Sequence, residues 1–198
     1  PRDVRQLQSY FSDENADAKV RAFPGEGLDI PLWILGSSTD SAYLAAEMGL
    51  PYAFASHFAP AQFRTAIQIY RSNFKPSGAI QKPYVMACVN VLGADTDDEA
   101  NLLLSSLLNL FVGIITNTRK PLQPAGSFPD IYNIPEVKNA VNNMLSCTFY
   151  GSKDTLKKNL AQFIAETEID ELMVASHIFD MDAKLKSFSI LSEALNVD

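Results

Sequence analysis

Cysteine and histidine are scarce in this sequence. Its 198 residues include two cysteines, Cys88 and Cys147, and two histidines, His57 and His177. No group of cysteine, histidine and acidic residues has the spacing of a metal site, so a metal centre is not expected. The two cysteines are expected to be free thiols in a reducing compartment, because a chain of this size needs no disulfide for stability.

Basic clusters and long apolar stretches are also lacking. The chain has 16 Lys and Arg against 23 Asp and Glu, a net charge of -7. A nucleic-acid partner needs a basic stripe, so this class of partner is excluded. The longest apolar run, residues 102–115, is interrupted by serine, asparagine and glycine, and neither a membrane span nor a signal peptide is expected. We therefore expect a cytoplasmic protein. The sequence begins with Pro1 and not with Met, which leaves room for an upstream segment.

The stretch from 31 to 60 has the pattern of a strand, a helix and a second strand. Residues 31–35 form a short, nearly unbroken apolar run, which is typical of a parallel strand buried on both faces. Small hydroxyl residues follow at 36–41, then a helix-period segment that begins at Ala42 and ends at Gly49. Residues 52–55 form the next apolar run, and this order predicts a βαβ unit.

The same alternation continues to the end of the chain. The spacing of apolar residues predicts one further pair of strands, at 84–92 and 171–178, and helices at 60–70, 97–115, 136–145, 153–167 and 183–195. The sequence 96–99 predicts a capping box for the helix at 97. Residues 116–135, rich in Pro, Gly and Asn, predict an irregular insertion. The chain is thus expected to form a single α/β domain over 1–198 with a parallel sheet.

Four strand–helix units make up half of a (β/α)8 barrel, which usually needs about 250 residues. Four parallel strands with helices on one side would leave two open edges and an uncovered inner face. Two architectures therefore remain open. Either the chain forms a small doubly wound sheet, or it is half of a barrel whose N-terminal half lies outside this sequence.

Four stretches, in this order, closely resemble the C-terminal half of the bacterial luciferase-like monooxygenases: LGSSTDSAYLAAEMGLPYAFASHFAP, KPYVMACVNVLGADTDDEA, FYGSKDTLKKNLAQF and DELMVASHIFD. The resemblance runs from about Leu28 to the end of the chain. It implies a flavin-dependent (β/α)8 TIM barrel of which this chain supplies roughly the C-terminal four βα units. It also implies reduced FMN, molecular oxygen and often a homodimer. The first four strands of the family, which would carry part of the flavin and substrate site, are absent from this chain.

The hydroxyl-rich turn at 36–41 is the best candidate for a binding site. Backbone N–H groups at a helix N-terminus attract anions, and serine hydroxyls add donors. The resemblance implies that the flavin phosphate lies against this turn, where the family uses an acid, a serine and a threonine. Those positions hold Ser37, Ser38 and Ser41 here, so the interaction of the acid is lost or replaced. The alternative is that Ser38 or Thr39 only caps the helix.

Both histidines, His57 and His177, lie at the C-terminal ends of predicted strands, the face that carries the chemistry of such barrels. We expect them to donate to the flavin ring or to a peroxyflavin oxygen, or to shape the substrate pocket; the alternative is a structural role. Asn90, polar in an apolar strand, is expected to point into the barrel mouth beside the cofactor, or else to be a buried amide bonded to backbone. Gly151-Ser152 is a second anion-site candidate, for which helix capping is the favoured interpretation.

The leading hypothesis is an FMN-dependent luciferase-like monooxygenase that oxidises a small organic substrate with O2 and reduced flavin. Its expected partners are a flavin reductase and either a second copy or an N-terminal half-barrel. One alternative is a deazaflavin- or FMN-dependent oxidoreductase that does not oxygenate. Another is a truncated, non-catalytic module for flavin binding or dimerisation. A weaker alternative is a small flavodoxin-like sheet that binds FMN, with helices on both faces.

Overall fold

The computed structural model describes residues 1–28 and 30–196, so the predicted domain over 1–198 is covered except at Asp29, Val197 and Asp198. The strands are β1 (Ile34–Gly36), β2 (Tyr52–Phe54), β3 (Val85–Gly93), β4 (Thr148–Gly151) and β5 (Glu171–Ala175). The α-helices are α1 (Arg2–Phe11), α2 (Thr39–Met48), α3 (Phe63–Asn73), α4 (Asp97–Ile115), α5 (Pro135–Met144), α6 (Lys153–Thr167) and α7 (Met181–Leu195). Short 3-10 turns lie at Asp13–Asn15, Pro60–Gln62, Asp130–Asn133 and Leu145–Cys147.

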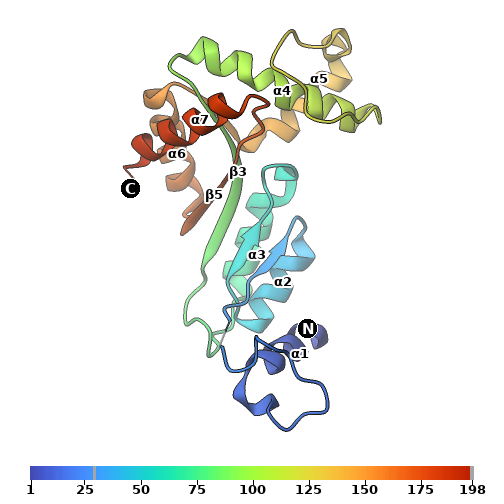
Figure 1. Ribbon diagram of the computed structural model, residues 1–198, viewed down its shortest axis with the longest axis vertical. Coiled ribbons are helices and arrows are strands. Elements are labelled where there is room, and N and C mark those ends of the chain that lie inside the picture. Colours follow the sequence, from blue (N-terminus) through green and yellow to red (C-terminus); the bar gives the residue numbers. More distant parts are fainter. Residues whose placement is uncertain (29, 197–198) are drawn as a thin grey trace.

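The long strand β3 is the centre of the sheet. β2 and β5 pair with its first part, β4 pairs with residues 90–93, and β1 pairs with β2. All of these pairings are parallel, as predicted. In Figure 1, β3 runs along the middle of the molecule. Helices α2 and α3 lie beside its lower part and α6 and α7 beside its upper part, with α1 at the bottom and α4 and α5 at the top.

The structure adds a strand that the sequence did not predict. Residues 148–151 lie in none of the predicted strands, but they form β4, which raises the number of strands from four to five. Four residues are too few to display a period, and this strand exists because the last four residues of β3 are available for pairing. β1 is displaced from the predicted 31–35 for a similar reason, since only residues 34–36 pair with β2.

Four helices cover one face of the sheet. The odd-numbered side chains of β3 from 85 to 91 are fully buried and belong to one apolar cluster with side chains of α2, α3, α6 and α7. The other members from β1 and β2 are Ile34, Tyr52 and Phe54. Gly49 ends α2 in a left-handed conformation, with φ 60°, as its predicted stop position requires.

The opposite face of the sheet is open. In the parallel register Leu35, Ala53 and Met86 form one row of this face, and Cys88 and Met173 are neighbours in the next. Leu35 is 68% exposed and Met173 is 51% exposed. Large apolar side chains of the edge strands β1 and β5 are thus left uncovered, whereas Ala53 and Met86 between them are each 8% exposed. Uncovered apolar side chains on this face are expected of the inner face of half a barrel. A flavodoxin-like sheet would have helices over these rows.

Helices α4 and α5 pack together around a second apolar cluster that includes Leu92 and Ile178. The predicted capping box of α4 is present, with Thr96 Oγ1 accepting from the Glu99 N–H and Glu99 accepting from the Thr96 N–H. By length and composition alone α4 is apolar enough to cross a membrane, although the interrupted apolar run did not predict this. Half of that apolar stretch is buried, and core helices of soluble proteins pass the same test.

Candidate functional site

The parallel sheet brings the predicted site residues to one end of the molecule, because all strands finish at the same edge. The turn with Ser37 follows β1, His57 lies three residues after β2, and His177 lies two residues after β5. Asn90 belongs to the last part of β3. Among these residues, the structure places Asn90 in direct contact with the His57 backbone and with the His177 ring.

Asn90 joins the two histidine segments. It is fully buried, and its Nδ2 donates to the backbone carbonyl of His57 at 2.5 Å and to Thr148 Oγ1 at 3.2 Å. Its Oδ1 lies 3.0 Å from His177 Nδ1. This matches the alternative of a buried amide bonded to backbone. Both the NH2 group and the oxygen of the Asn90 amide are used in hydrogen bonds within the protein.

The environment of the two histidines disfavours their charged forms. Burial lowers the pKa of His57 below its ordinary value of 6.5. The pKa of His177 is also lowered, first by burial and then by the nearby charges of His57 and Lys184. The Nδ1 atom of His57 is buried without a hydrogen-bond partner, and its ring meets the Phe58 ring edge-on at 4.9 Å between centroids. Both rings are therefore held neutral near pH 7.

Two hydroxyl groups, those of Ser41 and Tyr52, stabilise the turn between β1 and α2. Ser41 Oγ donates to the Ser38 carbonyl at 2.6 Å and lies 2.9 Å from the Tyr52 hydroxyl. Gly36 allows this arrangement, since a Cβ there would lie 1.9 Å from Ser41 Oγ. Burial raises the pKa of Tyr52, so the phenol stays protonated. Ser41 is thus directed into the turn, whereas Ser37 and Ser38 are exposed.

The first N–H group of α2 already has an acceptor. Gln62 Oε1 accepts from the Thr39 N–H at 3.2 Å, and Gln62 is an exposed side chain. Ser38 is the N-cap residue, but its hydroxyl makes no capping hydrogen bond. The predicted alternative, in which Ser38 caps α2 through its side chain, is therefore wrong in this structure. Its hydroxyl is left for another partner.

These features fit the phosphate of a flavin. The neutral Oε1 atom of Gln62 occupies the position on the Thr39 N–H at which an anion oxygen would bind. An anion could displace the Gln62 side chain with little loss of stability, because that side chain is exposed. Asp40 in the first turn of α2 is an unfavourable neighbour for an anion. In the described residues no lysine or arginine hydrogen-bonds to this turn or pairs with Asp40, so a compensating cation has to come from elsewhere.

The second anion-site candidate, Gly151-Ser152, is closed. Asp97 accepts from the Ser152 N–H at 2.6 Å and from Thr155 Oγ1 at 3.0 Å. These hydrogen bonds, above all the one from the Ser152 backbone, lower the pKa of Asp97 and keep it charged. The carboxylate of Asp97 already occupies the N-terminus of α6, while Ser152 is the N-cap residue but makes no side-chain capping hydrogen bond.

The remaining reactive side chains lack the features of a catalytic or metal site. Cys88 and Cys147 are free thiols, as predicted, and burial raises the pKa of both. Ser56 Oγ is used in a hydrogen bond to the Cys88 carbonyl, and Ser176 Oγ is buried without a partner. Residues 1–28 and 30–196 contain no group of three or more His, Cys, Asp or Glu side chains that could hold a metal ion.

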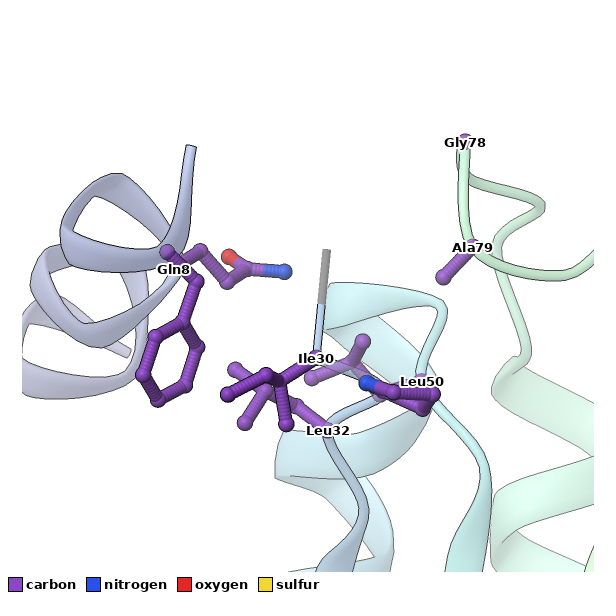
Figure 2. A pocket seen from close by; sticks show the side chains of 8 residues that line it. Gln8, Ile30, Leu32, Leu50, Gly78 and Ala79 are labelled. Carbon is purple, nitrogen blue, oxygen red and sulfur yellow. The ribbon is translucent and has the colours of Figure 1, made fainter. Parts of the chain in front are cut away.

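A large hollow lies at the other end of the strands. It has a volume of about 510 Å³ and is lined by residues of α1 and of the segments that precede β1, β2 and β3. Figure 2 shows Gln8 on one side of it, Gly78 and Ala79 on the other, and Ile30, Leu32 and Leu50 between them. Among residues 1–28 and 30–196, none of the side chains that line it is titratable. In barrels this end of the sheet serves stability rather than chemistry.

Three residues of the site were missed from the sequence: Tyr52, Gln62 and Thr148. Tyr52 begins an apolar run, and its hydroxyl was the one available signal of a polar partner. Gln62 and Thr148 carry no such signal, because their partners lie 23 and 58 residues away in the chain.

Comparison with known proteins identifies the family. The family model described as luciferase-like monooxygenase matches residues 6–172. The luciferase-like monooxygenase of Escherichia coli (strain K12) is 42% identical over 190 residues, which are 96% of this chain and 57% of that protein. The uncharacterized protein YvbT of Bacillus subtilis (strain 168) is 39% identical over 194 residues, 98% of this chain and 58% of that protein. The chain therefore spans less than two thirds of the length of these relatives.

Solved structures agree with this match. Apo-MsnO8 covers the whole chain with a TM-score of 0.80 and 27% identity, and the chain covers 60% of it. A type II Baeyer-Villiger monooxygenase in complex with FMN has a TM-score of 0.54 at 18% identity, over 83% of this chain and 47% of that one. An F420-dependent secondary alcohol dehydrogenase has a TM-score of 0.56 at 14% identity, over 91% and 52%. The predicted fold class, an α/β half of a luciferase-like barrel, is confirmed. With its sequence matched over most of its length, this chain belongs to the luciferase-like monooxygenase family.

Proposed function

We propose that the complete barrel to which this chain contributes is an FMN-dependent monooxygenase that oxidises a small organic substrate with O2. Family membership and a structural relative that binds FMN support an enzyme of the flavin-dependent oxidoreductase type. The observation that carries the proposal is the turn before α2. It presents two exposed serine hydroxyls and a helix N–H group whose present acceptor is a neutral, exposed side chain.

Within this site the described residues have separate tasks. The Thr39 N–H, Ser37 and Ser38 hold the phosphate, while Ser41 and Tyr52 keep the turn in shape behind them. Reduced flavin, when bound, would provide the group that reacts with O2. The two histidines, neutral and close to each other, contribute polar atoms at the mouth of the barrel without adding charge.

The open face of the sheet is the place for the missing half of the barrel. Exposed apolar side chains on it, such as Leu35 and Met173, are what a covering layer would bury. We propose that an N-terminal half-barrel of the kind present in the longer relatives covers this face and completes the flavin site. A homodimer of complete barrels and a flavin reductase that delivers reduced FMN are further parts of the proposal.

A second candidate function is deazaflavin-dependent hydride transfer without oxygenation. It is favoured by the F420-dependent alcohol dehydrogenase, which is as similar in fold as the FMN-binding monooxygenase. The absorption spectrum of the bound cofactor separates the two candidates. Oxygen consumption during turnover separates them independently.

Flavin titration tests the phosphate site. We would join the chain to the N-terminal segment of the E. coli relative that precedes the matched region and measure binding of FMN and of riboflavin, which lacks the phosphate. Ser38→Ala is expected to weaken FMN binding about tenfold, the loss of one charge-assisted hydrogen bond. It should leave riboflavin binding unchanged, as should the control Ser72→Ala on α3. Equal FMN affinities of wild type and Ser38→Ala would remove the phosphate assignment.

The histidines are tested by turnover in the same joined protein. His57→Ala and His177→Ala should leave FMN affinity within about twofold, because neither ring touches the turn, and lower turnover by about 10²-fold or more if a polar role is correct. Unchanged turnover in both variants would assign the rings to structure. Flavin binding by the 198-residue chain alone, without turnover in the joined protein, would favour the non-catalytic module.

A further inference from the structure

The orientation of the Asn90 amide is determined by its surroundings. One end of the amide faces the backbone carbonyl of His57 at 2.5 Å. A carbonyl oxygen only accepts hydrogen bonds, so this end must be the NH2 group and not the amide oxygen. The same NH2 group has its second acceptor in Thr148 Oγ1 at 3.2 Å. A flipped amide would place two oxygens against each other in a fully buried position.

This orientation determines which nitrogen of His177 carries the proton. The amide oxygen of Asn90 lies 3.0 Å from His177 Nδ1 and has no proton to give. The Nδ1 atom must therefore be the donor. We propose that Asn90 is a positioning residue that holds His177 in its Nδ1–H tautomer, so that the Nε2 lone pair is presented at the carboxyl edge of the sheet.

The rest of the site is consistent with a neutral ring of this kind. A protonated ring would carry a second N–H, but burial above all, together with the positive charge of Lys184, opposes protonation. The described residues give Nε2 no hydrogen-bond partner, and the His177 side chain is half-buried. Asn90 itself cannot meet a ligand directly because it is fully buried.

The chemical consequence is an acceptor and not a donor at this position. His177 Nε2 can accept a hydrogen bond from an N–H or O–H group of a molecule at the barrel mouth, whereas a donating role would need the other tautomer. The use of this lone pair toward a flavin or its substrate rests on the proposed function. The tautomer itself does not, because every contact that sets it lies within this chain.

Ring nitrogen NMR of the 15N-labelled chain without flavin tests the inference. The chain has two histidines, so the spectrum of His57→Ala assigns both rings. Wild-type His177 is expected to show a protonated Nδ1 and an unprotonated Nε2, the reverse of the tautomer that predominates in a solvent-exposed histidine. A wild-type spectrum with the proton on Nε2 would overturn the proposal without any Asn90 variant.

Two variants then assign the effect to Asn90. Asn90→Leu removes the acceptor and should shift the ring to a majority of the Nε2–H form. Thr148→Val is the matched control, because it removes a neighbour of the amide but leaves the Oδ1 contact, and should keep the Nδ1–H form. If Asn90→Leu does not fold, Asn90→Ala, which also removes the acceptor, takes its place, and a retained majority of the Nδ1–H form there would contradict the proposal. Failure of the FMN titration would leave these results standing.

Discussion

Two turns of this chain have nearly the same local design and opposite occupants. Each connects a strand to a helix through a glycine and a serine, Gly36-Ser37 before α2 and Gly151-Ser152 before α6. At α6 the backbone N–H of Ser152 is bound by the carboxylate of Asp97. At α2 the backbone N–H of Thr39 is bound by the neutral amide oxygen of Gln62.

The difference shows which helix N-terminus is available to an anion. A charged carboxylate with two hydrogen bonds complements the positive end of the helix and repels a phosphate. An amide oxygen contributes one weak hydrogen bond and no charge, so the N–H group of Thr39 itself is not paired with a carboxylate. The turn before α6 is therefore occupied by a structural contact, whereas the turn before α2 can exchange its acceptor for an anion.

The largest expected effect comes from the closed turn. Gly151 has φ 145°, and a Cβ there would lie 2.6 Å from Thr155 Cγ2 and 2.8 Å from Asp97 Oδ1. Gly151→Ala should therefore lower the free energy of unfolding by about 2–4 kcal/mol in denaturant titration. Gly126→Ala is the control, because nothing lies within 4 Å of its added Cβ, and it should change stability by less than about 0.5 kcal/mol. Equal free energies of unfolding for wild type and Gly151→Ala would contradict the close contacts of Gly151 with Thr155 and Asp97.

The next effect concerns the charge that closes α6. Asp97→Asn should lower the melting temperature by about 2–4 °C at neutral pH, because α6 loses a charged cap. The folded-state pKa of Asp97 is below its ordinary 3.8, so its contribution is present above that value and is lost as pH falls through the lowered pKa. Wild type and variant should therefore converge in melting temperature in strong acid. A constant difference at all pH values would show that the carboxylate charge is not responsible.

The smallest expected effect places a charge at the open turn. Gln62→Glu brings a carboxylate to the Thr39 N–H and imitates the closed turn, so FMN binding by the joined protein should weaken about threefold. Gln62→Ala only removes the exchangeable acceptor and should bind FMN as well as wild type or better. Riboflavin is the control ligand and should be insensitive to both changes. If Gln62→Glu binds FMN normally, the phosphate lies elsewhere.

Much of the fold could be predicted from local patterns. The period of α4, its capping box and the glycine stop of α2 are properties of adjacent residues, and the structure confirms each of them. β4 could not be predicted, because four residues become a strand only when β3 offers its last residues for pairing. The site was predicted as a set of candidates at strand ends. Its connections, such as Asn90 to His177, join residues 87 positions apart and leave no local trace.

The sequence by itself determined where strands and helices alternate, which end of each strand carries polar side chains, and to which family the chain is similar. Those properties follow from spacing and residue type over a few positions. Only the tertiary structure decided that Asp97 closes one helix N-terminus, that Gln62 covers the other, and that Asn90 orients the ring of His177. In each case the partner is a side chain distant in the chain, and hydrogen bonds between such partners depend on how the strands are brought together.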